Sequence, residues 1–286
     1  MMKLGVLGTA DIAFRRFLPA LEKCRNISFS GVASRTPEKG KPFVERFGGT
    51  IYPSYDALLA NDEIEAVYIP LPPALHYEWG KKALAAGKHL LLEKPFTDSA
   101  AHTRELIALA REKDLAVHEN YMFIYHKQLQ EIRRMLSNGE LGQLRLIRAT
   151  FGFPKRAETD FRYHRALGGG ALLDCGGYPT RLVQELLGLD TRVVQANLST
   201  EHGYEVDLYG NAVLQNERGE CAQIAFGMDN AYRCELELWG SHATLIASRI
   251  FTAGAGVVPS AVIRSSTEEH QQELSEDDQL DRKSVV

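Results

Sequence analysis

The length, composition and charge of the chain exclude several classes of protein. It has 286 residues, of which 44% are hydrophobic and 24% are charged, values typical of a globular protein with about two domains. The net charge of −4 lacks the basic excess of a nucleic-acid-binding protein. No apolar stretch reaches the roughly 20 residues of a membrane span, and the four cysteines lack zinc-ligand spacing. We therefore expect a cytoplasmic protein with reduced thiols, no metal, and no nucleic-acid or membrane partner.

Up to about residue 120, short β-branched or leucine-rich runs alternate with longer segments of helical periodicity, as in a parallel sheet with crossover helices. We expect strands at residues 4–7, 28–34, 50–52, 66–69, 89–92 and 116–119. We expect helices at residues 14–23, 39–47, 76–86 and 100–112. Thr97, Asp98 or Ser99 is expected to cap the last of these helices. Together these elements form the first predicted domain, residues 1–120.

The pattern changes in the second predicted domain, residues 121–286. After a predicted helix at residues 127–137, strand signals follow one another from Leu144, interrupted by one long helical stretch at about residues 171–187. A turn is expected at residues 216–219, and the alternation at residues 233–239 predicts a strand with one buried face. We therefore expect a mainly antiparallel sheet, followed by a frayed tail at residues 275–286.

The first predicted strand ends in a turn suited to a dinucleotide phosphate. The segment Gly8-Thr9-Ala10-Asp11-Ile12-Ala13 has small residues where the chain must turn tightly, approach a pyrophosphate, and pack closely against the following helix. Amides at the start of that helix would face the anion. The pattern is a degenerate GxAxxA rather than GxGxxG, so an ordinary strand-to-helix turn remains the alternative.

The end of the second predicted strand indicates a cofactor preference. An acidic residue at this place accepts hydrogen bonds from a ribose 2′-hydroxyl, whereas basic residues suit a 2′-phosphate. Here the chain has Ala33-Ser34-Arg35, with no acid among these three residues, and Lys39 follows shortly after. We therefore predict NADP(H), with NAD(H) less favoured. The alternative is that Arg35 only occupies a solvated loop.

A charged pair follows the fifth predicted strand, at the carboxyl edge where open α/β sheets bind ligands. This Glu93-Lys94-Pro95, together with Leu71-Pro72-Pro73-Ala74-Leu75-His76 and with the segment Gly168-Gly169-Gly170-Ala171-Leu172-Leu173-Asp174 and Tyr178, resembles the glucose-fructose oxidoreductase, inositol dehydrogenase and MocA family. The resemblance covers about residues 3–250. Asp160-Phe161-Arg162-Tyr163 before the glycines makes the NADP-dependent 3-ketoreductases of nucleotide-linked deoxysugars the most similar members.

This resemblance implies an α/β fold in two parts. The first is an N-terminal Rossmann domain with a doubly wound parallel sheet, and the second is a C-terminal α+β domain with an open, mostly antiparallel sheet. A nicotinamide is expected between them, near Lys94. The chain departs from the family pattern at Ala10, Ala13 and Pro73. The glycines and proline of Cys175-Gly176-Gly177-Tyr178-Pro179 also predict an irregular helix there.

Candidate site residues follow from the motifs and from helical spacing. Lys94 and Tyr178 are the predicted catalytic residues, the phenol as proton donor and the ammonium as the group that orients and stabilises the reacting oxygen. Asp174, Tyr178 and Arg181 fall on one face of a regular helix. A half-buried tyrosine with a satisfied hydroxyl is the alternative for Tyr178. The resemblance implies that Asp174, Arg181 and Tyr163 bind substrate, and that the cofactor contacts Gly8, Thr9, Ala10, Asp11, Ile12, Ser34, Arg35, Lys39, Leu71, Pro72, His76, Glu93, Lys94, Asn120 and Arg162.

The function expected from these features is hydride transfer between NADP(H) and a sugar carbonyl or alcohol, most specifically 3-ketoreduction of a nucleotide-linked deoxysugar. Two alternatives remain open: a dehydrogenase of a free aldose or a dihydrodiol, and a non-enzymatic NADP-binding regulator. The resemblance also implies a homodimer or homotetramer formed through the C-terminal sheet.

Overall fold

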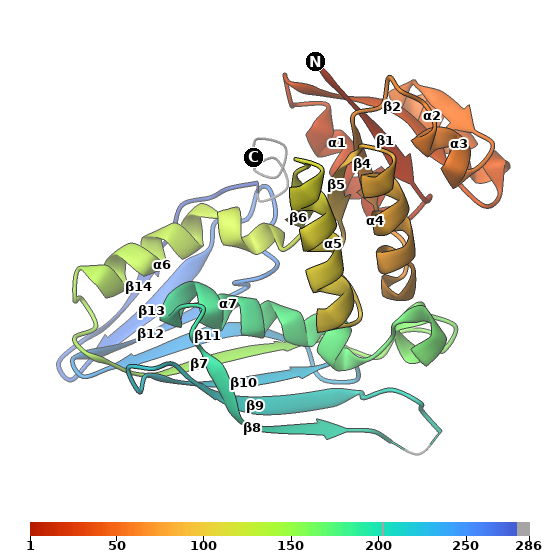
Figure 1. The fold of residues 1–286 in the computed structure, drawn as a ribbon. Helices are drawn as coiled ribbons and strands as arrows, with labels where there is room; N and C mark the ends of the chain where they lie inside the picture. Colours follow the sequence, from red (N-terminus) through yellow and green to blue (C-terminus); the bar gives the residue numbers. More distant parts are fainter. Residues whose placement is uncertain (202, 279–286) are drawn as a thin grey trace. The chain divides into compact units, whose positions relative to one another are not determined.

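The computed structural model describes residues 1–201 and 203–278 and divides the chain into two compact units (Figure 1). The first contains Met1–Tyr121 and Ala166–Gly168, and the second contains Met122–Arg165 and residues 169–278. The predicted tail lies outside the described residues from 279 onward. For residues 275–278 the prediction is wrong, because the Ser275 amide donates to Glu131 Oε2 at 3.2 Å and Asp277 Oδ2 accepts from the Lys127 amide at 3.1 Å.

The first unit has a six-stranded sheet of order β3-β2-β1-β4-β5-β6, in which every pair is parallel. This confirms the predicted doubly wound sheet. The strands are β1 Met2–Leu7, β2 Ile27–Ala33, β3 Thr50–Tyr52, β4 Ala66–Ile69, β5 His89–Leu92 and β6 Val117–Glu119. The helices are α1 Leu18–Leu21, α2 Lys41–Phe47, α3 Tyr55–Leu59, α4 His76–Ala85 and α5 Ala100–Glu112, with a π-turn at Ala13–Phe17 and 3₁₀ turns at Pro37–Gly40 and Pro73–Leu75.

Successive strand residues point to opposite faces of this sheet, so the unit has two apolar cores. Val6 packs on one face with Phe17 and Phe43, and Leu7 packs on the other with Leu58 and Leu106. Ser99 caps α5 by accepting from the His102 amide, as predicted. The short helix α3 was not predicted, because five residues are too few to show a helical period.

The second unit has an eight-stranded sheet of order β14-β13-β12-β11-β7-β10-β9-β8. Its strands are β7 Leu144–Gly152, β8 Arg192–Ser199, β9 Tyr209–Gln215, β10 Cys221–Gly227, β11 Arg233–Gly240, β12 Ala243–Ser248, β13 Ser260–Ser265 and β14 Glu269–Glu273. Within the described residues only β7 and β10 pair in parallel, so the predicted mainly antiparallel sheet is confirmed. The helices α6 Lys127–Ser137 and α7 Gly177–Leu187 lie over one face of this sheet (Figure 1). Further 3₁₀ turns cover Met122–Tyr125, Phe161–Tyr163 and Arg165–Leu167.

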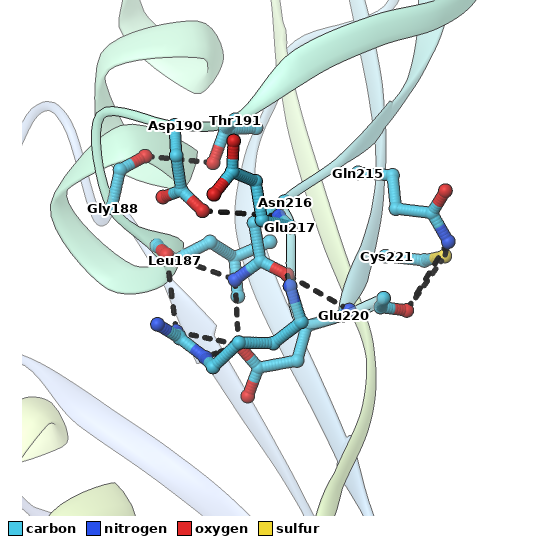
Figure 2. Close-up of polar contacts among 11 residues, drawn as sticks. Leu187, Gly188, Asp190, Thr191, Gln215, Asn216, Glu217, Glu220 and Cys221 are labelled. Atoms are coloured by element: carbon cyan, nitrogen blue, oxygen red, sulfur yellow. Dashed lines mark hydrogen bonds and ion pairs between the residues drawn. The ribbon is translucent and has the colours of Figure 1, made fainter.

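The carboxyl end of α7 is held by the turn between β9 and β10 (Figure 2). Asn216, which is buried, donates to the Leu187 carbonyl at 3.0 Å and to Glu220 Oε2 at 2.7 Å. Its Oδ1 accepts from the amides of Arg218 and Glu220. One side chain therefore satisfies a terminal helix carbonyl and closes the predicted turn, which anchors α7 to the sheet.

Candidate active site

The turn after β1 has the conformation that the sequence motif requires. Gly8 has φ +115°, and a β-carbon there would lie 2.8 Å from Leu71 Cδ2. Its amide donates to the Ala33 carbonyl at 2.8 Å, which ties the turn to β2. Ala13 is fully buried, as close packing of the following helix demands, whereas Asp11 is exposed. The turn therefore leaves the first residues of the helix accessible to an anion.

Polar and basic groups gather where β2 ends. Ser34 is buried and its hydroxyl lies 3.5 Å from Thr9 Oγ1, which joins this segment to the phosphate turn. Arg35 and Lys39 are exposed. The hydroxyl of Tyr55 forms a hydrogen bond with the Arg35 backbone. Burial of the phenol raises the pKa of Tyr55, and this hydrogen bond opposes the effect. The side chain of Arg35 thus extends into solvent from a backbone held by the core.

The segment around Lys94 is fastened on both sides by buried side chains. On one side, Glu93 Oε1 accepts from the Tyr68 hydroxyl at 2.6 Å and from Asn120 Nδ2. On the other, His76 lies with Nδ1 2.8 Å from the Pro95 carbonyl and Nε2 2.7 Å from the Leu71 carbonyl. Lys94 itself is half-buried.

His76 is fully buried and both of its ring nitrogens face backbone carbonyls. Burial lowers its pKa, against the opposing effects of the two carbonyls and Glu93. This geometry disfavours the predicted contact between the His76 ring and the cofactor. It favours instead a supporting role, in which His76 joins the segments that contain Leu71 and Pro95.

Asn120 provides a test of whether this unit fits a nicotinamide dinucleotide. The residue is fully buried, and its Oδ1 has no hydrogen-bond partner among the described residues. A buried acceptor without a partner is costly, and a ligand amide or hydroxyl would satisfy it. Together with the accessible phosphate turn and the donors after β2, this acceptor means that the residues present fit a dinucleotide. Gly8, Thr9, Ser34, Arg35, Lys94 and Asn120 are the residues that would hold it.

In the second unit, Tyr178 occupies the first turn of α7 within a group of aromatic rings. Its ring centroid lies 4.9 Å from that of Phe151, 5.7 Å from Phe251 and 5.9 Å from Phe123. Tyr178 is half-buried. A π-turn at Leu172–Gly176 directly precedes α7, which confirms the predicted irregularity. Turns of this kind are frequent at functional sites, and this one ends two residues before Tyr178.

Asp174, which is buried, and Arg162, which is partly buried, form an ion pair with Arg162 Nε 2.7 Å from Asp174 Oδ2. Arg162 also lies 3.1 Å from Asp160 Oδ1. Burial acts to lower the pKa of Arg162, but the two carboxylates outweigh it and the pKa is raised. Arg162, predicted to contact the cofactor, therefore pairs with Asp174, predicted to bind substrate, which lies within the π-turn at Leu172–Gly176.

The other two predicted substrate residues have partners of their own. Tyr163 is buried; its hydroxyl accepts from the Arg156 amide at 2.9 Å and donates to the Met228 carbonyl at 3.2 Å. Arg181 pairs with Glu185 on the same helix at 2.6 Å. These contacts favour supporting roles for Tyr163 and Arg181.

The triple glycine is required by its backbone conformation and by its neighbours. Gly168 and Gly170 have φ +76° and +122°, and a β-carbon on Gly169 would lie 2.4 Å from the Arg162 carbonyl. Sequence reasoning did not single out Asp207, whose carbonyl and carboxylate accept from the amides of Ala171 and Leu172. It also missed Tyr68, although a phenol in the middle of a fully apolar strand signals a buried partner.

Two negative observations concern the described residues alone. They contain no group of three or more His, Cys, Asp or Glu side chains placed to hold a metal ion. None of their helices has the length and apolar character needed to cross a membrane.

Comparison with known proteins gives matches along most of the chain. Residues 2–121 match the model of an oxidoreductase family with an NAD-binding Rossmann fold, and residues 129–246 match a GFO/IDH/MocA C-terminal domain. A dTDP-3,4-didehydro-2,6-dideoxy-alpha-D-glucose 3-reductase from Actinomadura kijaniata is 42% identical over 96% of this chain and 82% of its own length. D-xylose 1-dehydrogenase (NADP(+)) 2 from Haloferax volcanii is 32% identical over 80% of this chain and 70% of its own.

Among solved structures, a 3-ketoreductase from Actinomadura kijaniata in complex with NADP and TDP-benzene has a TM-score of 0.96 and 42% identity. The match covers 99% of this chain and 87% of that one. Structures of the same 3-ketoreductase include a variant with a tyrosine replaced by phenylalanine and another with a lysine replaced by alanine.

Proposed function

Because the chain belongs to the GFO/IDH/MocA oxidoreductase family, we propose that it is an NADP(H)-dependent reductase of the 3-keto group of a nucleotide-linked deoxysugar. The observation that carries this proposal is the 42% identity, over nearly the whole chain, to a reductase of a dTDP-linked keto sugar. Fold alone does not determine function, so the proposal also depends on the residues that perform the chemistry.

A reduced nicotinamide, when bound, supplies the hydride for a ketone. The residues of this chain must then stabilise negative charge on the carbonyl oxygen and provide a proton. The phenol of Tyr178 is the proposed proton donor, and its ring packs against Phe151 and Phe251. The ammonium of Lys94 is the proposed electrostatic stabiliser, held by a segment that Glu93 and His76 fasten.

The substituted residues of the related 3-ketoreductase support this assignment. Its replaced lysine and tyrosine are separated by the same number of positions as Lys94 and Tyr178. Asp174, held by Arg162, is the proposed partner of a sugar hydroxyl. The preference for NADP(H) over NAD(H) rests on Ser34, Arg35 and Lys39 and on the lack of an acid where β2 ends.

We also propose that the protein assembles as a homodimer or homotetramer through the sheet face opposite α6 and α7. Trp239, on β11, is 50% exposed there and pairs across the strands with Leu146 and Thr244. An exposed tryptophan with a leucine beside it is typical of a protein interface.

The test is to follow NADPH oxidation with matched panels of dTDP-linked 3-keto sugars and of free sugars. We expect turnover with the nucleotide-linked sugars, and about a hundred-fold lower kcat for Tyr178→Phe and Lys94→Ala, with NADPH binding retained in fluorescence titrations. Tyr232→Phe removes the hydroxyl of an exposed tyrosine and is the matched control. Unchanged kcat in both site variants would contradict the mechanism.

Free sugars define the second candidate function, which the 32% identity to a D-xylose dehydrogenase favours. Turnover of aldoses with NADP+, without turnover of nucleotide-linked sugars, would replace the first proposal by this one. A protein that binds NADPH but turns over neither panel would be a regulator.

A further inference from the structure

Tyr68 places a hydroxyl in the middle of an otherwise apolar sheet. It belongs to β4, whose four residues are all buried, and it is itself fully buried. Its hydroxyl donates to Glu93 Oε1 at 2.6 Å. Because β4 and β5 pair in parallel, with Ile69 opposite Leu92, the Glu93 carboxylate lies at the end of the neighbouring strand. A buried hydroxyl is costly unless it is hydrogen-bonded, and an apolar side chain could fill the same space. The bond to Glu93 is therefore the reason for a tyrosine at this position.

The Glu93 carboxylate accepts hydrogen bonds from two separate segments of the sheet. Asn120, which follows β6, donates through Nδ2 to the same oxygen that accepts from Tyr68. The backbone amide of Asn120 also donates to the Leu92 carbonyl at 3.0 Å, so the sheet fixes the backbone from which the Asn120 side chain reaches Glu93. The two donors, one on β4 and one just after β6, converge on one oxygen and so restrict the orientation of the carboxylate.

The ring of Tyr68 has a second contact, with the helix that follows the phosphate turn. It stacks on Phe17 with centroids 4.0 Å apart and an angle of 28° between the planes. Phe17 ends the π-turn at Ala13–Phe17, directly after the segment that would bind the cofactor phosphates. Tyr68 therefore contacts the nucleotide-binding helix through its ring and the neighbour of Lys94 through its hydroxyl.

We propose that Tyr68 is a positioning residue for Lys94: by holding the Glu93 carboxylate it sets the place and the electrostatic environment of the next side chain. This inference rests on the proposed function, because it assigns Tyr68 to the reaction that Lys94 serves. On the opposite side, His76 fixes Pro95, and the Phe96 amide donates to Glu119 at 2.7 Å. Lys94 thus lies between two residues whose positions are fixed, Glu93 and Pro95. Tyr68 acts on Glu93, the one of the two that has a charged side chain.

The variant Tyr68→Phe removes the hydroxyl and keeps the stack on Phe17. Asn120 can still donate to Glu93, so the carboxylate keeps a partner and we expect the fold to be retained. Tyr77→Phe is the matched control, because Tyr77 donates to Glu105 at 2.5 Å in the same unit, on exposed surface. Circular dichroism and thermal unfolding check that both variants fold.

The first readout needs no substrate. Competitive acetylation of amines, quantified by mass spectrometry, reports the reactivity of Lys94 relative to the exposed Lys113. Without the Tyr68 hydroxyl, the Glu93 charge is less shared and favours the protonated, unreactive form of Lys94. We expect the relative reactivity of Lys94 to fall about three-fold or more in Tyr68→Phe and to stay unchanged in Tyr77→Phe. Equal reactivity in wild type and Tyr68→Phe would overturn the inference, whatever the protein turns over.

The second readout is the kinetic coupling of Tyr68 with Lys94. We expect Tyr68→Phe to lower kcat about ten-fold, with KM for the sugar and Kd for NADPH within about two-fold of wild type. In the Lys94→Ala background the same change should have no further effect, since Tyr68 acts through Lys94. An equal loss in both backgrounds would indicate a merely structural role. If the wild type turns over no sugar but Lys94 reactivity still falls, the proposed function fails while the positioning of Lys94 stands.

Discussion

Arg35 is the residue on which the cofactor preference depends. Its backbone is held by Tyr55 and its side chain is exposed, so a change there alters ligand contacts without disturbing the core. We expect Arg35→Ser to raise the Kd for NADPH about ten-fold, because a charge-assisted bond to the 2′-phosphate is lost. The Kd for NADH should remain within about two-fold.

Fluorescence titration with both cofactors measures the effect of Arg35→Ser. Arg25→Ser, at another exposed arginine of the same unit, is the control. If NADPH and NADH weaken equally, Arg35 does not read the 2′-phosphate and the preference for NADP(H) is wrong.

Single residues also show where spacing along the chain stops being informative. Asp174, Tyr178 and Arg181 share a face of a regular helix, but the π-turn at Leu172–Gly176 interrupts that period before Tyr178. Spacing also cannot reveal partners: Asp174 binds Arg162 and Arg181 binds Glu185. The sequence therefore predicted suitable residue types for the site. Only the contacts in the structure separate residues that are free to bind a ligand from residues that support other side chains.

The helix α6 begins at a buried histidine, which makes its stability depend on pH. His126 Nδ1 accepts from the Gln128 amide at 3.1 Å. Burial lowers the pKa of His126, against an opposing effect of Asp277. The unfolded chain therefore takes up this proton first as the pH falls. The contribution of neutral His126 to stability is fully present above its pKa in the unfolded chain, about 6.5. It is lost as the pH falls from there toward the lower pKa of His126 in the folded protein.

His126→Asn keeps an N-cap acceptor and removes the titration. Between pH 7.5 and 5.5, we expect the free energy of unfolding of the wild type to fall by about 1 kcal/mol more than that of this variant, as measured by urea denaturation. His270→Asn, on an exposed strand, should follow the wild type. Parallel curves for wild type and His126→Asn would exclude a buried neutral His126.

At the level of elements, local signals predicted most boundaries. The bounds of β4, β5, α5 and α6 are those expected from the sequence, because β4 and β5 are short apolar runs and α5 and α6 have a helical period with a recognisable cap or stop. The short helix α3 and the parallel pairing of β7 with β10 were not predicted. Five residues show no period, and strand pairing between distant segments leaves no local trace.

The assembly of the whole molecule can be tested at the open face of the second sheet. Trp239→Arg puts a charge where we propose that two copies meet, and burying it there would be costly. We expect light scattering to change from a dimer or tetramer to a monomer, with the Kd for NADPH unchanged. Val258→Arg, at an exposed apolar position outside the strands, is the control. A wild type that is monomeric at micromolar concentration would contradict the proposed interface.

The sequence by itself determined the class of both folds, the place of the phosphate turn and the family motifs. These features are local: an apolar period, a glycine at a tight turn such as Gly8, or a short run such as Glu93-Lys94-Pro95 is complete within a few residues. The tertiary structure alone decided the partners of Asp174, the burial of His76 and the link from Tyr68 to Glu93. The contacts of His76 and Tyr68 join segments that only the assembled sheet brings together, so they depend on strand order and register. The Asp174–Arg162 pair lies outside the sheet and depends on how the turn at Phe161–Tyr163 packs against the π-turn at Leu172–Gly176.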